Sequence, residues 1–368
     1  TLSKLTTGEK LTLKWTCHRR ETLLLLIKVL RFESLEKCNQ FLQSANHEVL
    51  TEEERKRYCC HLELPKPFLT ESTKKFIEEL LAHFKLSYAA PILLLTQTDR
   101  APIIEAVFSQ LTTRYPANSC CHLTLPCTAE SYFSQVAQRC GFLETVQNSS
   151  QFEMLLNKKL SAIAHPYFLL ISRFEYAPKE LGQELAGILR GLSANHLHLM
   201  LCGGQKLEEL KYLTGELSLL NFTEIHYWPE LNREDIFAMR DERCQGLLLS
   251  EEVADQLLVF CGGHPTLLKI ALQWYQELPS LETLTTYPQR LSEIPEISGW
   301  FMPYLQNSQK AQKIVEWLTA LKIAPAREFL PDPLLRDLYW KNLLVRRNDN
   351  WVYWRCEAIR LAGKAVFR

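Results

Sequence analysis

The chain has 368 residues, of which 46% are hydrophobic and 23% charged, with 42 basic residues against 42 acidic ones. This length predicts two or three domains rather than a single core, and the composition excludes extensive disorder. A net charge of zero excludes whole-molecule electrostatics as a reason to expect nucleic acid or an anionic membrane as partner.

The twelve cysteines would indicate a disulfide framework only in a small secreted chain. Many stand inside apolar runs, such as Leu201-Cys202 and Phe260-Cys261, where a free cysteine behaves as a small buried hydrophobic residue. The chain contains no CxxC pair, and the apolar run at 23–30 is interrupted by Lys28 and too short to span a bilayer. We therefore expect a reducing, cytoplasmic compartment, no membrane insertion, and no metal or other cofactor.

Residues 1–70 are expected to form a small α+β segment. Its elements, in chain order, are a half-buried strand at 11–17, helices at 21–30 and 34–43, and a strand at 58–64. A helix with Thr70 as its N-cap follows over 70–84.

Strands and helices then alternate through residues 71–230. The expected strands are 91–95, 120–125, 167–171, 197–201 and 224–228, and the helices between them are 102–113, 129–140, 152–164 and 181–192. The run 91–95 is short and continuously apolar, as is typical of a strand buried on both faces of a parallel sheet. This alternation predicts a doubly wound parallel sheet.

The remainder of the chain is predicted to be mostly helical. Asn232 and Ser250 are expected N-caps, and Pro265 is the expected first residue of a further helix. Two short apolar-aromatic runs after the last expected helix predict a hairpin and, with the helices before it, a winged helix. The expected elements are helices at 234–243, 251–260, 266–275, 309–320 and 332–340 and hairpin strands at 343–345 and 351–354, which assign 231–305 to one domain and 306–368 to another.

One turn carries a family resemblance. The sequence Cys261-Gly262-Gly263-His264-Pro265-Thr266-Leu267-Leu268 resembles the turn between two lid helices in STAND and archaeal-type AAA+ P-loop ATPases. Locally, Gly262 or Gly263 can supply a left-handed C-cap and Pro265 can start the next helix. The resemblance covers residues 91–368 by element order and only this turn by motif. It implies a P-loop NTPase-type sheet, a helical lid over 231–305 and a winged helix over 306–368.

The resemblance also gives the phosphate loop a position, after the first strand of the sheet. A P-loop has the pattern G-x-x-x-x-G-K-[ST], in which glycines free the backbone N–H groups, the lysine reaches the phosphates and the hydroxyl holds magnesium. The corresponding residues are Gln97-Thr98-Asp99-Arg100-Ala101-Pro102-Ile103-Ile104. Gln97 and Pro102 replace the glycines, and Ile103 and Ile104 replace the lysine and hydroxyl. Arg100 is expected to be a solvated turn residue.

The acidic pair that holds the metal in such ATPases is missing as well. At the end of the expected strand 167–171, Ser172 and Arg173 occupy the acidic positions, and Glu175 stands two residues too late. The loss of both motifs predicts a degenerate, non-catalytic scaffold.

The cysteines and histidines raise the question of a metal site or a catalytic nucleophile. The similar runs Cys59-Cys60-His61 and Cys120-Cys121-His122 invite a zinc hypothesis, but adjacent residues on a strand point to opposite faces, so no metal site is expected. No histidine stands on a recognisable nucleophile elbow, and there is no G-x-S-x-G. His264 is expected to be a surface or packing residue.

The basic residues of the chain concentrate near its C-terminal end. They are Arg346, Arg347, Arg355, Arg360, Lys364 and Arg368. A winged helix with a basic wing can bind DNA, but the expected helix 332–340 balances its charges and carries three leucines, which favours packing against protein. Arg346, Arg347, Trp351 and Trp354 are the candidate contacts with a partner protein or DNA.

These observations predict a non-catalytic STAND/AAA+-like scaffold or regulatory subunit of a bacterial-type multiprotein assembly. It would act through protein–protein contacts, with a partner and an oligomeric state that the sequence leaves open. Two alternatives remain: a winged-helix DNA-binding regulator, and an ATPase that binds nucleotide through an unconventional phosphate loop.

Overall fold

A computed structural model of the chain describes residues 20–30, 38–39, 41–42, 47, 50–51, 54, 69–85, 90–98, 100–126, 128–163, 165–192, 197–214, 218–244 and 246–368. The chain divides into two compact units, Thr1–Phe68 and Leu69–Arg368. In the first, the expected helix is present as α2 (Arg20–Leu30), which buries Leu23 and Ile27. The two strands expected at 11–17 and 58–64 lie outside the described residues.

The second unit contains a five-stranded parallel sheet with the order β2-β3-β4-β1-β5. The strands are β1 (Ile92–Leu95), β2 (Cys120–Thr124), β3 (Tyr167–Ser172), β4 (Leu197–Gly203) and β5 (Glu224–Tyr227). The crossover from β1 to β2 runs to one edge of the sheet, whereas that from β4 to β5 passes β1 to the other edge. The carboxyl end of β1 therefore lies near a topological switch point, where open α/β sheets bind ligands.

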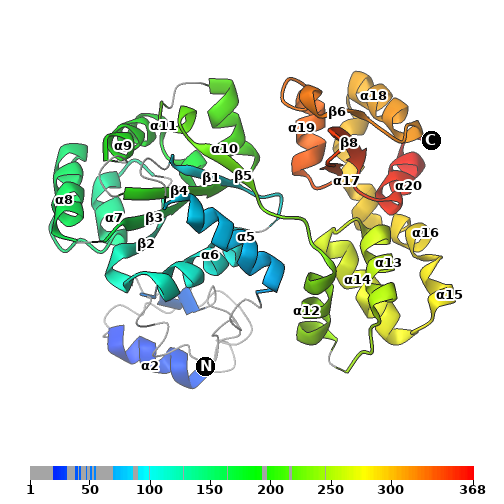
Figure 1. Cartoon of the computed structure of the whole chain (residues 1–368), viewed down its shortest axis with the longest axis horizontal. Coiled ribbons are helices and arrows are strands. Elements are labelled where there is room, and N and C mark those ends of the chain that lie inside the picture. Colours follow the sequence, from blue (N-terminus) through cyan, green and yellow to red (C-terminus); the bar gives the residue numbers. More distant parts are fainter. Residues whose placement is uncertain are drawn as a thin grey trace, which may run out of the picture. The chain divides into compact units, whose positions relative to one another are not determined.

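Helices cover both faces of this sheet (Figure 1). They are α5 (Glu71–His83) and α6 (Arg100–Arg114) on one face, and α7 (Tyr132–Arg139), α8 (Ser149–Ala162) and α9 (Lys179–Leu192) on the other. Alternate residues of each strand serve the two cores: Ile92 and Leu94 face α5 and α6, and Leu93 and Leu95 face the opposite side. The expected doubly wound parallel α/β fold is confirmed.

The sequence did not predict several short elements between β4 and β5. They are α10 (Gln205–Glu209), a further helical turn (Leu210–Thr214) and α11 (Ser218–Asn221). Each is too short to show a helical period, and their positions depend on packing against longer elements.

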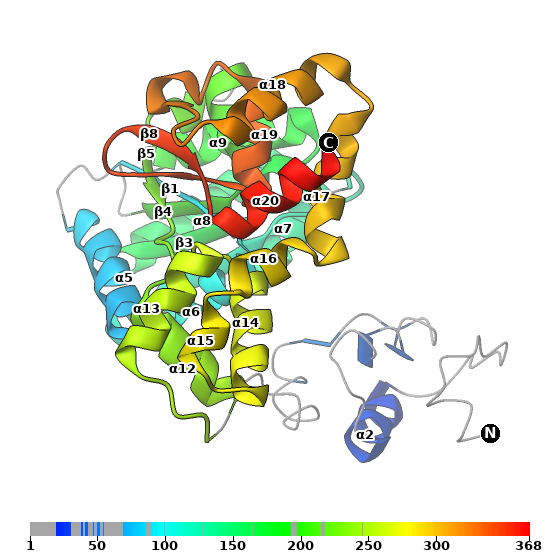
Figure 2. The ribbon, with the colours of Figure 1, turned by 90° about the vertical axis from the view of Figure 1, so that its right-hand side faces the viewer.

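A helical region follows the sheet (Figure 2). It consists of α12 (Arg233–Arg243), α13 (Glu251–Cys261), α14 (Pro265–Glu277), α15 (Leu281–Leu284), α16 (Tyr287–Ser292) and α17 (Pro295–Leu305). The three expected start signals are confirmed: Asn232 forms a capping box, Ser250 accepts a hydrogen bond from the N–H of Val253, and Pro265 is the first residue of α14.

The chain ends in a small domain with the element order of a winged helix. Its elements are α18 (Ser308–Thr319), β6 (Ala324–Pro325), a helical turn (Ala326–Glu328), α19 (Pro333–Trp340), β7 (Leu344–Arg346), β8 (Trp351–Trp354) and α20 (Glu357–Val366). The three strands form an antiparallel sheet in the order β6-β8-β7. The predicted hairpin is confirmed, and β6 and α20 were not foreseen.

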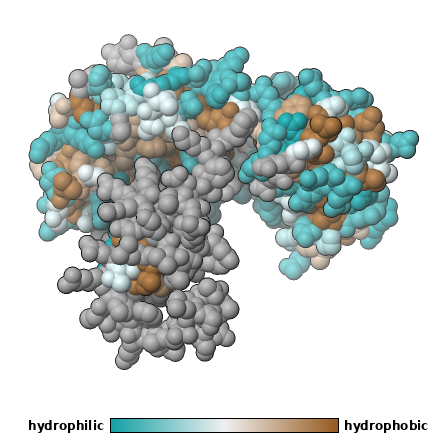
Figure 3. Space-filling model, turned by 90° about the horizontal axis from the view of Figure 1, so that it is seen from below, coloured by the Kyte–Doolittle hydropathy of each residue, from teal (hydrophilic) through white to brown (hydrophobic). Residues whose placement is uncertain are grey.

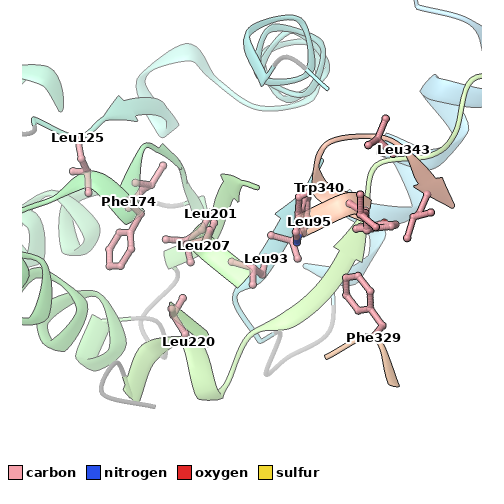
Figure 4. Packing of buried hydrophobic residues seen from close by; sticks show 14 of the residues in the cluster. Leu93, Leu95, Leu125, Phe174, Leu201, Leu207, Leu220, Phe329, Trp340 and Leu343 are labelled. Carbon is pink, nitrogen blue, oxygen red and sulfur yellow. The ribbon is translucent and has the colours of Figure 1, made fainter. Parts of the chain in front are cut away.

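Hydrophobic packing is continuous from the sheet into this domain. Figure 4 shows Leu93 and Leu95 of β1 in the same cluster as Trp340 and Phe329. On the surface, Leu143, Leu248 and Leu321 are highly exposed but stand on separate segments, and the face in Figure 3 shows hydrophobic areas interspersed with hydrophilic ones. Among the described residues, no helix is long and apolar enough to cross a membrane.

Candidate functional site

A side-chain hydrogen bond shapes the start of the loop after β1. The hydroxyl of Thr96 accepts a hydrogen bond from the backbone N–H of Thr98 at 3.1 Å, and α6 begins at Arg100. Asp99 lies outside the described residues. Pro102 occupies the first turn of α6, where a missing N–H costs little.

Ile103 and Ile104 do not face this loop. Their exposed fractions are only 4% and 9%, and both belong to the core between α5, α6 and the sheet. The positions where a P-loop lysine and hydroxyl would meet phosphate are therefore filled by side chains that contribute to folding.

Arg100 is bound to a buried carboxylate. Its guanidinium donates to Glu175, whose side chain is 0% exposed, and the two form an ion pair across the carboxyl ends of β1 and β3. The expectation of a solvated Arg100 is therefore wrong, because α6 starts early enough to direct this side chain toward the end of β3.

The chain after β3 explains how Glu175 reaches this position. Ser172 is buried, and its hydroxyl lies 3.0 Å from Nε2 of His122 and 3.2 Å from the Thr124 hydroxyl on β2. Arg173 then adopts a left-handed conformation with φ of 63° and starts a short helical turn, Phe174–Tyr176. That turn carries Glu175 back to Arg100. Sequence position alone had excluded Glu175, because a left-handed arginine is uncommon.

Arg355 is the centre of a second network. Its Nη2 atom donates to the side chain of Gln97 at 2.6 Å, and its Nη1 atom lies 2.5 Å from the carboxylate of Glu230 and 3.0 Å from the carbonyl oxygen of Gly262. Its Nε donates to the carbonyl of Asn342 at 3.1 Å. Arg355 is only 3% exposed. It connects several segments inside the protein and is not the surface cation that the basic cluster suggested.

Gln97 connects Arg355 to the backbone of α19. Its amide nitrogen donates to the backbone carbonyl of Tyr339 at 2.5 Å, while its amide oxygen accepts from Arg355. The loop after β1, the lid turn and the winged helix are thus held together by side chains of the chain itself.

The lid turn has the conformation that its glycines suggested. Gly262 and Gly263 have φ of 59° and 70°, so α13 ends in a left-handed turn. A Cβ atom on Gly262 would collide with the backbone carbonyl of Arg355. Glycine is therefore required there for two reasons, the positive φ and the close approach of the winged helix.

His264 is a buried part of this turn. Its Nδ1 accepts from the N–H of Thr266 at 3.2 Å, which caps α14, and its ring stacks on Trp300 at 4.8 Å. Burial, reinforced by the charge of Arg355, lowers the pKa of His264 from 6.5 to about 4. The expectation of a packing residue is met.

This histidine gives the protein a pH-dependent stability. The unfolded state binds the proton more tightly than the folded state, so the contribution of His264 is complete above pH 6.5 and is lost as the pH falls through about 4. We expect the free energy of unfolding to drop by about 3 kcal/mol more in the wild type than in His264→Asn over this interval. Urea unfolding at both pH values measures the difference. Asparagine keeps a capping oxygen but does not titrate, so equal losses in the two proteins would contradict the assignment.

A third contact joins the sheet to the winged helix. The Glu208 carboxylate on α10 accepts from Nε1 of Trp340 at 2.8 Å and from the Tyr227 hydroxyl at 2.9 Å, and Glu208 is 0% exposed. Burial raises the pKa of the Glu208 carboxyl. Trp340 therefore packs inside the chain, where it anchors α19.

The four candidate contact residues are separated by the fold. Trp354 is 5% exposed and donates to the carbonyl of Trp317, so it offers no surface to a partner. Trp351 is half-buried and lies beneath the ammonium of Lys322. Arg346 and Arg347 both line a cavity within the second unit, where Arg346 is half-buried and Arg347 is exposed at the turn between β7 and β8.

That cavity, here called the wing cleft, has a volume of about 640 Å³. Its walls come from the ends of β1 and β5, the segment that leads into α12, the lid turn and the winged helix. Its lining includes Gln97, Thr98, Trp228, Glu230, Arg346, Arg347, Asn348 and Asn350.

Among the described residues, no cluster of three or more histidine, cysteine, aspartate or glutamate side chains could hold a metal ion. Cys120, Cys121 and His122 are described, and the first two are free thiols. Cys59, Cys60 and His61 lie outside the described residues.

No protein-family model and no curated protein matches the chain. Solved structures similar to it include the ORC2 protein of Aeropyrum pernix, with 11% identity over 83% of this chain and 96% of that one and a TM-score of 0.43. The replication initiator DnaA, bound to AMPPCP and single-stranded DNA, has 15% identity over 75% and 78% of the two chains and a TM-score of 0.38. The RuvB Holliday junction branch migration motor of Thermotoga maritima is also similar, with 12% identity over 78% and 94% and a TM-score of 0.38.

Proposed function

We propose that this protein is a non-catalytic AAA+-like module that serves as a scaffold or regulatory subunit of a multiprotein assembly. The observation that supports this most directly is the Arg100–Glu175 ion pair at the carboxyl ends of β1 and β3. It occupies the place where the phosphate loop and the metal-binding carboxylates of an ATPase would meet.

A phosphate entering this place would compete with a buried carboxylate. Arg100 is the first residue of α6, directly after this loop, and a phosphate bound through the same N–H groups would take it from Glu175, whose side chain is 0% exposed. Removing one partner of a buried ion pair costs about 3–5 kcal/mol. Magnesium at Glu175 would likewise place a second cation beside the guanidinium of Arg100, which already compensates the charge of this carboxylate.

The arrangement of the second unit also needs no nucleotide. Arg355 and Gln97 join the loop after β1 to the lid turn and the winged helix, and Trp340 with Glu208 joins α19 to α10. A chain that fixes its own domains in this way can present a constant surface to partner proteins, which is what a scaffold requires.

The DNA-binding alternative needs basic side chains free to meet phosphates along a duplex. The guanidinium of Arg346 instead lies over the rings of Tyr227, Phe329 and Tyr339, at 4.2, 5.1 and 5.5 Å from their centroids. Because Arg346 lines the wing cleft, this geometry favours the scaffold.

The purified protein should hydrolyse neither ATP nor GTP above background, and magnesium should add nothing to any effect of ATP on its melting temperature. The physical reason is that Ile103 and Ile104, which replace the lysine and hydroxyl of a phosphate loop, are buried in the core, while Glu175 is paired with Arg100. Phosphate-release assays and thermal denaturation with ATP, in magnesium and in EDTA, test both statements.

The matched variants are Arg100→Ala and Arg114→Ala, which remove a cation from opposite ends of α6. Magnesium-dependent turnover that Arg100→Ala abolishes and Arg114→Ala leaves intact would refute the non-catalytic assignment. Duplex DNA binding with a steep salt dependence, lost in a double Arg346→Glu and Arg347→Glu variant, would favour the DNA reader instead.

A further inference from the structure

The wing cleft is lined by two arginines that form no ion pair with a described carboxylate. Its charged lining residues are Glu230, Arg346 and Arg347. Both carboxylate oxygens of Glu230 accept from Arg355, at 2.5 and 3.1 Å, so that negative charge is already compensated. Two arginines remain.

Neither of these arginines has a carboxylate within ion-pair distance among the described residues. The guanidinium of Arg346 contacts three aromatic rings, and that of Arg347 lies 4.5 Å from the ring centroid of Tyr353. The Glu208 carboxylate lies behind Tyr227, accepts hydrogen bonds from Tyr227 and Trp340, and interacts electrostatically with Arg346 without forming an ion pair. Aromatic rings cover the faces of a guanidinium and leave its N–H groups, which are strong bidentate donors to oxyanions, at the edge.

We propose that the wing cleft binds a small organic anion, a molecule carrying a phosphate or carboxylate group, through Arg346 and Arg347. The volume of about 640 Å³ falls within the range of about 300–1,000 Å³ that is usual for small-molecule sites. Asn348 and Asn350 add side-chain amides to the lining, and Trp228 adds an aromatic surface. This inference goes beyond the proposed scaffold role and does not use the Arg100–Glu175 pair.

Such a ligand would act on the arrangement of the second unit. The cleft walls belong to the sheet, to the lid turn at Gly263 and to the winged helix. An anion bound to all three would stabilise the folded state by mass action and raise the melting temperature. The bound anion would thereby regulate how firmly the winged helix is held.

The test uses the whole chain with pyrophosphate and, separately, citrate, both without magnesium. Arg346→Gln and Arg347→Gln remove the proposed contacts, and Arg327→Gln removes the same charge from the same domain outside the cleft lining. We expect at least one anion to raise the melting temperature of the wild type and Arg327→Gln by about 2 °C or more near saturation. Titration calorimetry should show affinity weaker by about tenfold or more in the two cleft variants.

The variants also separate binding from the general stabilisation that such anions give to proteins. Equal shifts in all four proteins, or no shift with either anion, would overturn the proposal. If Arg346→Gln does not fold because its ring contacts are lost, Arg347→Gln still decides, because the Arg347 guanidinium lies over the ring of Tyr353 at an exposed position. A response to pyrophosphate only identifies a phosphate ligand, and a response to citrate only identifies a carboxylate.

Discussion

Replacing Arg355 with methionine should lower the free energy of unfolding by about 3 kcal/mol. Methionine fills similar space but provides no donors, so Gln97, Glu230 and the carbonyl oxygens of Gly262 and Asn342 all lose a hydrogen bond. The loss should lie near the lower end for a broken buried pair, because the Glu230 side chain is 49% exposed and can be rehydrated. Urea unfolding measures the change.

Arg360→Met is the matched control. Arg360 lies on α20, where its partly exposed side chain pairs with Glu357 one turn away and donates to the carbonyl of Leu318 at 3.3 Å. Its replacement should cost less than about 1 kcal/mol. Arg355→Lys should also be destabilising, because an ammonium cannot reproduce the fork of donors that reaches four partners. A loss in Arg355→Met no larger than in the control would show that the network does not hold the domains together.

Restoring the missing lysine of the phosphate loop should destabilise the protein rather than create an ATPase. In Ile103→Lys, an ammonium would enter the hydrocarbon core between α5, α6 and the sheet, where residue 103 is 4% exposed. We expect a loss of about 3–5 kcal/mol in the free energy of unfolding. Urea unfolding and a phosphate-release assay on the same preparation give the answer.

Thr113→Lys controls for the added charge and for the replacement of a β-branched residue by lysine, because residue 113 is exposed on the same helix α6. It should change stability by less than about 0.5 kcal/mol. A stable Ile103→Lys protein that gains magnesium-dependent ATP binding would show that this side chain faces the loop and that the site is dormant rather than filled.

Arg355 and Ile103 both belong to contacts that hold the fold together near the end of β1. In a working P-loop the residues after β1 face an exchangeable ligand, whereas here they serve the core and the contacts between domains. Under the proposed scaffold role, a partner would meet a surface whose form depends on Arg355 and on the proposed ligand of the wing cleft, and not on nucleotide hydrolysis.

The sequence by itself determined the elements whose signals are local. Continuous apolar runs identified β1 and β3, because a strand buried on both faces needs no polar alternation. The alternation of strands with helices along the chain placed the other three strands of the sheet. Asn232, Ser250 and Pro265 marked helix starts, because capping involves residues only two or three positions apart. The absence of a lysine and hydroxyl at Ile103 and Ile104 was equally visible. Short elements such as α10 and β6 gave no periodic signal.

Only the tertiary structure decided which side chains meet. Arg100 and Glu175 are 75 positions apart, Trp340 and Glu208 are 132 apart, and Arg355 and Gln97 are 258 apart. No spacing rule links such pairs, because the contacts arise from the strand order of the sheet and from the docking of the winged helix onto it. Arg346, Arg347 and Arg355 formed one basic cluster in sequence. In the structure Arg346 and Arg347 line the cleft, whereas Arg355 is buried and hydrogen-bonds to several segments. Neighbours along a strand alternate in direction, and burial then depends on what packs against each face.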